Sequence, residues 1–108
     1  MIPKKIADTV VQRAGGACEV MVARSCTGRA EQLHHRKMRS QLGGNEVVNL
    51  LHICHVCHDW VHKHPALSYE RGYLVRGARH EAFEPVLYRN ARLFFLAPDG
   101  ELVRGGRK

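Results

Sequence analysis

Apolar residues recur at every fourth position near the start of the chain, at Ile2, Ile6, Val10 and Ala14. This spacing places them on one face of an α-helix. Pro3 suits an early position in that helix, and Gly15-Gly16 predicts its end. The charged residues Lys4, Lys5 and Arg13 are then expected on the solvated face of the helix.

The middle of the chain alternates short ordered segments with loops. The expected segments are a strand over 30–35, a loop over 41–45, an apolar run over 47–53, a helix over 58–63 and a second short helix over 66–71. Pro65 separates the two helices, because proline interrupts a helix that has already begun.

The last third of the chain is richest in strand signals. Strands are expected over residues 73–75, 86–88, 92–96 and 101–104. The turn Pro98-Asp99-Gly100 joins the last two as a hairpin, and residues 105–108 form a mobile basic tail. The pattern predicts one α+β domain over residues 1–104, without internal repeats.

Length and charge narrow the classes of function. A chain of 108 residues with few aromatics buries a modest core, so another source of stability is expected. Its formal net charge of +7 favours a polyanionic partner, although solubility alone also accounts for such a charge. No membrane span or signal peptide is visible, which indicates a cytoplasmic protein without a membrane partner. In a reducing compartment, cysteines are more often metal ligands than disulfides.

Cys54 and Cys57 form a C-x-x-C pair, whose spacing allows two thiolates to reach one ion from a tight turn. Cys18 and Cys26 supply two further ligands for a tetrahedral structural zinc site. The gap of seven residues between Cys18 and Cys26 is longer than in most zinc knuckles. The alternative is that Cys18 is a buried apolar residue and Cys26 is incidental.

The histidines indicate a second, different metal site. On a helix, His58 and His62 lie four residues apart and share one face. On a strand, the adjacent residues His34 and His35 point to opposite faces, so one can bind metal while the other meets a substrate. Three histidine ligands leave open coordination positions, as catalytic metal sites require.

Several motifs stand together between residues 18 and 65. They are Leu33-His34-His35-Arg36-Lys37, Gly43-Gly44, Asn49-Leu50-Leu51, Cys54-His55-Val56-Cys57-His58 and His62. In combination they resemble the HNH endonuclease family, in particular its small zinc-stapled members from phages and their actinobacterial hosts. The resemblance implies a small ββα-metal (His-Me finger) core with a structural zinc site, an N-terminal helix and a C-terminal β-hairpin region.

The resemblance also implies roles for individual residues. His35 would be the general base that activates water, and Asn49 would hydrogen-bond backbone across the loop and hold His35 in line. His34, His58 and His62 would bind one catalytic divalent ion, which could be Mg²⁺, Mn²⁺, Ni²⁺ or Zn²⁺. The structural Zn²⁺ would be held by Cys18, Cys26, Cys54 and Cys57.

Four basic residues lie near this site in the sequence and are the best candidates for DNA phosphate contacts: Arg36, Lys37, Arg39 and Lys63. A plain solvated basic face is the alternative for each of them.

The expected activity is hydrolysis of DNA phosphodiester bonds with low sequence specificity, by water attacking a phosphate held at the metal. The alternative is a zinc-stapled DNA-binding or accessory module without catalysis. Phage genome packaging, with terminase or portal proteins as partners, is one compatible pathway, beside restriction and homing. A monomer or a weak dimer is expected.

Overall fold

Helix α1 (Lys4–Ala14) opens the fold, and the computed structural model describes residues 1–105. The helix begins directly after Pro3 and ends at Gly15, which adopts a left-handed conformation with φ of 61°. The N–H of Gly15 donates to the carbonyl of Val11 at 3.1 Å, which closes the last turn. These bounds confirm the N-terminal helix expected from the four-residue spacing.

A β-hairpin and a helix follow one another in the middle of the chain. Strands β1 (Gln32–His35) and β2 (Leu50–Ile53) pair antiparallel, with His34 opposite Leu51. Helix α2 (His55–Lys63) begins three residues earlier than expected, because Cys54 caps it: the Cys54 sulfur accepts from the Cys57 N–H at 3.3 Å. Pro65 then opens the short helix α3 (Pro65–Glu70), as the sequence predicts.

The C-terminal third forms a second antiparallel sheet. Its strands are β3 (Val86–Tyr88), β4 (Arg92–Leu96) and β5 (Leu102–Arg104), in that order. Short 3₁₀ turns complete the fold: η1 (Arg39–Gln41), η2 (Val47–Asn49) and η3 (Glu81–Phe83). Within residues 1–105 the fold therefore has three α-helices and two antiparallel sheets, which confirms the α+β class and the C-terminal hairpin.

The strand expected over residues 73–75 is wrong. The N–H groups of Tyr73 and Leu74 both donate to the carbonyl of Ser68, at 2.9 and 3.1 Å, and Val75 donates to the carbonyl of Arg36 at 2.9 Å. All three residues are buried. A short apolar run in an irregular but buried segment has the same composition as a strand, so the sequence could not separate the two.

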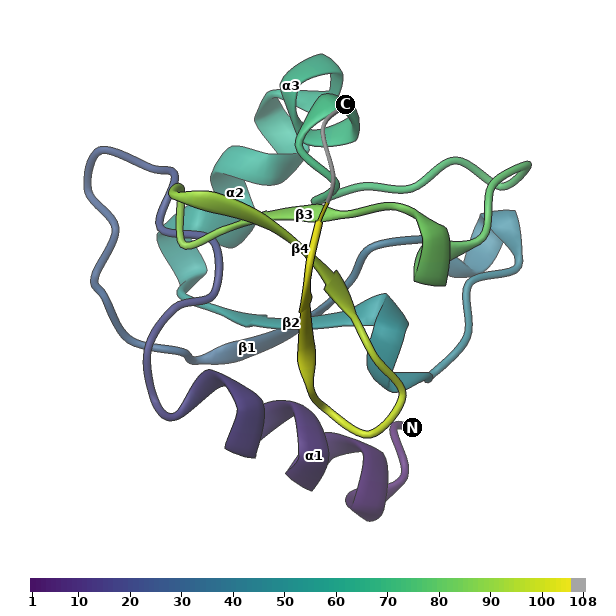
Figure 1. The fold of residues 1–108 in the computed structure, drawn as a ribbon. Helices are drawn as coiled ribbons and strands as arrows, with labels where there is room; N and C mark the ends of the chain where they lie inside the picture. Colours follow the sequence, from purple (N-terminus) through teal and green to yellow (C-terminus); the bar gives the residue numbers. More distant parts are fainter. Residues whose placement is uncertain (106–108) are drawn as a thin grey trace.

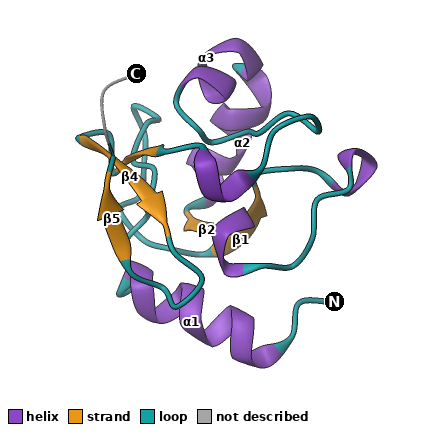
Figure 2. Ribbon diagram, turned by 45° about the vertical axis from the view of Figure 1, so that its right-hand side comes forward, coloured by secondary structure: helices purple, strands orange, loops and turns teal. Residues whose placement is uncertain are grey.

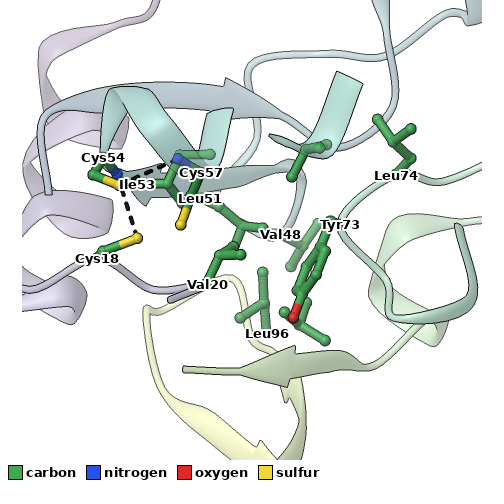
Figure 3. Close-up of a cluster of buried hydrophobic side chains, with 12 residues drawn as sticks. Cys18, Val20, Val48, Leu51, Ile53, Cys54, Cys57, Tyr73, Leu74 and Leu96 are labelled. Atoms are coloured by element: carbon green, nitrogen blue, oxygen red, sulfur yellow. Dashed lines mark hydrogen bonds between the residues drawn. The ribbon is translucent and has the colours of Figure 1, made fainter. Parts of the chain in front are cut away.

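The β1–β2 hairpin lies between helices. Figures 1 and 2 show α1 on one side of the hairpin and α2 and α3 on the other, with the β3–β5 sheet packed beside them. A small cluster formed by Val10, Val47 and Leu50 joins α1 to the hairpin. The main core lies on the other side of β2, and Figure 3 shows cysteines at one end of it and Tyr73 and Leu96 at the other.

A buried ion pair also fixes α1. Arg13 was expected on the solvated face, but its guanidinium meets the buried carboxylate of Glu19 at 2.7 Å. The Tyr88 hydroxyl donates to the same carboxylate at 2.7 Å, and the N–H of His52 donates at 2.8 Å. This network links α1, β2 and β3 through charge-assisted hydrogen bonds.

None of the helices within residues 1–105 has the length and apolar character needed to cross a membrane. Of the mobile basic tail expected over 105–108, residues 106–108 lie outside the described residues, and the N–H of Gly105 donates to the carbonyl of Leu93 at 2.8 Å.

Candidate metal centres and active site

The four cysteines converge into one cluster. Their sulfur atoms all lie within 4.8 Å of one another. The sulfurs of Cys26 and Cys54 are 3.7 Å apart. In a tetrahedral zinc site with Zn–S bonds of about 2.3 Å, the sulfurs are about 3.8 Å apart. The cluster therefore has the donor set and the dimensions of a structural zinc site, and the long gap between Cys18 and Cys26 does not prevent their convergence.

Backbone N–H groups point at each sulfur of this cluster. Met21 and Cys54 donate to Cys18 at 3.4 and 3.3 Å, Ala23 donates to Cys57 at 3.5 Å, and Gly28 donates to Cys26 at 3.4 Å. Such bonds stabilise thiolates, which are the form that binds metal. At Cys54, burial raises the pKa, but backbone hydrogen bonds from Cys57 and Thr27 outweigh it and bring the pKa to about 6.

Three histidines from two elements form a second cluster. His34 lies on β1, while His58 and His62 lie one turn apart on α2, and one ring nitrogen of each lies within 4.8 Å of the others. The ring centroids are 5.0 to 5.5 Å apart. His34 is buried, His58 is half-buried and His62 is exposed, so the cluster opens toward solvent on the His62 side.

Hydrogen bonds fix which ring nitrogens are free. Nε2 of His34 donates to the carbonyl of Tyr73 at 2.7 Å, which leaves Nδ1 as the ligand atom. Nδ1 of His58 donates to the amide oxygen of Gln32 at 2.7 Å, which leaves Nε2. Partners of this kind orient metal-binding imidazoles and raise their basicity as ligands.

The environment favours the neutral form of His34 and His58. Burial lowers the pKa of His34 to about 3, and the neighbouring rings of His58 and His62 act in the same direction. Burial and His62 also lower the pKa of His58. Neutral imidazole nitrogens suit divalent transition metals, so the three histidines fit one such ion with coordination positions left open.

His35 is not part of this triad, yet it borders the same space. A pocket of about 230 Å³ is lined by Leu33, His34, His35, Met38, Arg39, His58 and His62. Nε2 of His35 donates to the side-chain oxygen of Asn45 at 2.8 Å, so its Nδ1 is free to accept a proton. His34 and His35 therefore have different hydrogen-bond partners, and although strand alternation predicts that they point to opposite faces, both line one pocket.

Asn49 crosses the loop between β1 and β2. Its side-chain oxygen accepts from the N–H of Lys37 at 2.7 Å, and its amide group donates to the carbonyls of Lys37 and Gly44 at 3.1 and 2.9 Å. Asn49 is completely buried. These are the backbone contacts expected of it, and they hold the loop next to His35 without exposing Asn49 to the pocket.

The structure contradicts the expectation that Arg36 and Lys37 contact phosphate. Arg36 is 0% exposed, and its guanidinium donates to the carbonyls of Gly72 at 2.8 Å, Val48 at 2.7 Å and Glu81 at 3.2 Å, and also to that of Glu84. These bonds join the segment of Arg36 to three other segments of the chain, around Val48, Gly72 and residues 81–84. Because each guanidinium nitrogen donates to a carbonyl inside the protein and the side chain is buried, Arg36 has no surface to offer a nucleic acid.

Lys37 is buried as well. Its ammonium group lies 2.9 Å from the carboxylate of Glu81 and also donates to the carbonyls of Gly77 and Arg79. Lys37 therefore holds the segment around Gly77 against the loop between β1 and β2. It is not available to contact a phosphate.

Arg39 and Lys63 remain at the surface. Arg39 is exposed and lines the histidine pocket, where it can meet a phosphate. Lys63 is exposed and pairs with Asp59 at 2.9 Å on the outside of α2. An exposed ion pair of this kind contributes little to stability, so Lys63 can exchange Asp59 for another anion at small cost. Of the four basic candidates, these two keep the accessibility that a DNA contact needs.

Three hydrogen-bond partners of the histidines were not expected from the sequence. They are Asn45 for His35, Gln32 for His58 and the carbonyl of Tyr73 for His34. Gln32 lies two residues from His34 on the same strand, so its place on the pocket side could have been inferred from strand alternation. The other two contacts depend on how distant loops close, and no local pattern carries that information.

Comparisons with family models, with curated proteins and with solved structures found no match to this chain, so its function is inferred from the geometry above.

Proposed function

We propose that this protein is a metal-dependent endonuclease of the HNH type, with a ββα-metal core formed by β1, β2 and α2. The observation that carries the proposal is the shared pocket, in which three histidines converge and His35 stands beside them with Nδ1 free. A metal-binding triad next to an oriented base is the arrangement that hydrolysis of a phosphodiester needs.

His34, His58 and His62 would hold the divalent ion. Such an ion supplies Lewis-acid stabilisation of the charge that develops on the phosphate oxygens. Nδ1 of His35 takes a proton from water as the water oxygen forms a bond to phosphorus. The bond from phosphorus to the 3′-oxygen breaks, and that oxygen leaves as a hydroxyl after taking up a proton, so the products carry 5′-phosphate and 3′-hydroxyl ends.

The surface charge supports DNA as the substrate. The chain carries a formal net charge of +7, and Arg39 stands exposed at the pocket. A non-catalytic zinc-stapled binding module, the alternative function, accounts for the cysteine cluster. It gives no reason for three further histidines to converge beside a fourth.

A plasmid-nicking assay tests the proposal. Purified protein is incubated with supercoiled plasmid and Mg²⁺, Mn²⁺, Ni²⁺ or Zn²⁺, and the conversion to open-circular or linear DNA is followed. His35→Ala is expected to lower the rate at least a hundredfold, on the order of the loss of a general base. His55→Ala is the matched control, because His55 is exposed and pairs with Glu31 outside the pocket. Absence of cleavage with every metal, or equal rates for His35→Ala and wild type, refutes the proposal.

A further inference from the structure

A second pocket is formed by α3 and the segment that follows it. Its volume is about 460 Å³, twice the 230 Å³ of the histidine pocket, and the two pockets share no lining residue. Its charged and aromatic lining residues are Tyr69, Glu70, Arg76, Arg79 and Glu84, and these residues define the arginine pocket. Ligand pockets in proteins measure about 300–1,000 Å³, so this space suits a small molecule or one unit of a polymer.

The fold fixes the segment that carries the two arginines. The chain leaves α3 through Gly72, which has a φ of 80° and where an added Cβ would clash with the carbonyl of Pro85. Val75 then lines the pocket and is buried. Further along, the ammonium group of Lys37 donates to the carbonyl of Arg79. In Figure 1 this segment runs from α3 to the right-hand edge of the molecule. It is therefore anchored at both ends before any ligand binds.

Arg76 and Tyr69 form a stacked pair at this pocket. The guanidinium carbon of Arg76 lies over the Tyr69 ring, 4.1 Å from its centroid. Tyr69 is half-buried and Arg76 is exposed, so the guanidinium is held on the ring and stays accessible. Nucleic-acid bases stack on aromatic rings and on the planes of arginine guanidinium groups. The pair is therefore a platform for a flat, conjugated ring.

Two carboxylates and a second arginine accompany this platform. Glu70, which follows Tyr69 on α3, is exposed. Arg79 and Glu84 pair at 3.3 Å, with side chains that are 66% and 20% exposed. Such a pair contributes little to stability, and a guanidinium has five N–H donors, so Arg79 can also bind a ligand. The pocket thus combines hydrogen-bond acceptors with cationic donors.

This combination narrows the chemistry of the ligand. The carboxylates disfavour a simple polyanion, and the charged groups disfavour a purely apolar molecule. A nucleotide carries a flat ring for the stacked pair, N–H donors for a carboxylate and a phosphate for an arginine. Among the bases, guanine has two adjacent donors, N1–H and N2–H, on its Watson–Crick edge, and these match the two oxygens of one carboxylate.

We propose that the arginine pocket binds a guanine nucleotide. The base stacks on the Arg76–Tyr69 pair with its Watson–Crick edge toward Glu70, and the phosphate binds Arg79. The ligand is either a free nucleotide or an unpaired guanine nucleotide of a DNA strand, because both offer the same ring and phosphate. Since this pocket shares no residue with the histidine pocket, binding here does not require nuclease activity.

Two series of titrations test the site on the full chain, without added divalent metal. In the first, calorimetry compares dGMP with dAMP. In the second, a thymine single strand with one central guanine is compared with the same strand carrying adenine. Wild type is expected to bind the guanine form about tenfold more tightly in at least one series, which is the scale of discrimination by one bidentate base contact.

Substitutions at the pocket test the individual contacts. Arg76→Ala should weaken binding of the guanine form about tenfold, the scale of one lost stacking contact. Arg76→Lys should weaken it nearly as much, because lysine keeps the charge but has no planar group. Glu70→Gln should remove the preference for guanine over adenine. Both side chains are exposed, so these variants should melt at the wild-type temperature.

Lys5→Ala is the control. It removes an exposed positive charge on α1, which lies on the opposite side of the molecule from α3 in Figure 1. This variant should keep the wild-type ratio of guanine to adenine affinity. A ratio that falls as far in Lys5→Ala as in Arg76→Ala would show that net charge causes the effect, and would refute the site.

Other results would also overturn the proposal. They are equal affinity for guanine and adenine in both series, wild-type affinity of Arg76→Ala for the guanine form, and wild-type affinity of Arg76→Lys, because charge alone would then suffice. A guanine preference in the strand series assigns the pocket to DNA, and a preference for dGMP alone assigns it to a free nucleotide.

The guanine site and the nuclease function fail separately. If the chain prefers guanine in these titrations but cleaves no plasmid with any metal, the site stands and the nuclease proposal fails. If the chain cleaves plasmid but shows no preference between the bases, the nuclease proposal stands and the guanine site fails.

Discussion

The side-chain oxygen of Asn45 lies 2.8 Å from Nε2 of His35, and the amide group of the same asparagine donates to the carbonyl of Met1 at 3.1 Å. Asn45 thereby fixes both the orientation and the tautomer of the imidazole that we propose as general base. The chain preceding α1 supports the base indirectly through this side chain.

Replacing Asn45 with alanine is expected to lower the cleavage rate by about 10- to 100-fold, as loss of an orienting partner does elsewhere. DNA affinity and melting temperature should change little, because Asn45 is only half-buried. Asn45→Asp keeps the acceptor for Nε2 and should retain much of the rate. Independently of cleavage, ¹⁵N NMR should show the Nε2–H tautomer of His35 in wild type and a mixture in Asn45→Ala. A single tautomer in both proteins would contradict this role.

The cysteine cluster predicts a strong dependence of stability on zinc. Cys57 is completely buried, and Cys57→Ser should release the ion and lower the free energy of unfolding by about 3 kcal/mol or more. Zinc content per chain and thermal unfolding measure both effects. A strong chelator should reproduce the loss in wild type. A chain that contains no zinc, and a Cys57→Ser variant that melts at the wild-type temperature, would exclude the structural zinc site.

Acid should destabilise the protein through His34. Its folded-state pKa is about 3, below the ordinary value of 6.5, so between these values the unfolded chain binds more protons. Stability from this group is therefore complete above pH 6.5 and is lost as the pH falls toward 3, by up to about 1.4 kcal/mol per pH unit. A metal at the triad leaves the sign unchanged, because protons compete with it.

Chemical denaturation at several pH values across this range measures how steeply the free energy of unfolding depends on pH. His34→Gln keeps an N–H donor for the Tyr73 carbonyl and removes the titration, so its slope should be shallower. His64→Gln, on an exposed residue outside the triad, should keep the wild-type slope. A His34→Gln slope equal to that of wild type would show that other groups cause the acid sensitivity.

Substitution of Arg36 should affect stability, whereas substitution of Arg39 should affect DNA binding. Arg36→Met removes four hydrogen bonds to backbone carbonyls, most of them buried, so it should lower the free energy of unfolding by about 3 kcal/mol or more. Arg39→Ala, at the exposed surface, should change stability by less than about 0.5 kcal/mol. It should instead weaken DNA binding and reduce the salt dependence by about one charge. Denaturant unfolding and binding isotherms at several salt concentrations separate the two, and an Arg39→Ala variant with wild-type DNA affinity would remove Arg39 from the interface.

The sequence predicted which cysteines and histidines cluster, and part of that signal is local. Spacing of three residues between cysteines and four between histidines places each pair on one turn or face, whatever the rest of the fold does. Arg36 and Lys37 were misassigned for the converse reason. Their burial depends on carbonyls at Gly72, Glu81 and Arg79, which only the tertiary fold brings near. A basic string in a basic protein looks solvated, and only the tertiary structure shows that its positive charges hold loops together.

Cys57 and His58 are consecutive residues of α2, so one peptide bond separates the two candidate metal centres. His58 and His62 lie on α2, whose first turn carries Cys57 and is capped by Cys54. For the proposed nuclease, zinc bound by the cysteines would therefore also position two of the three histidines, and a newly synthesised chain would become active only after it had bound zinc.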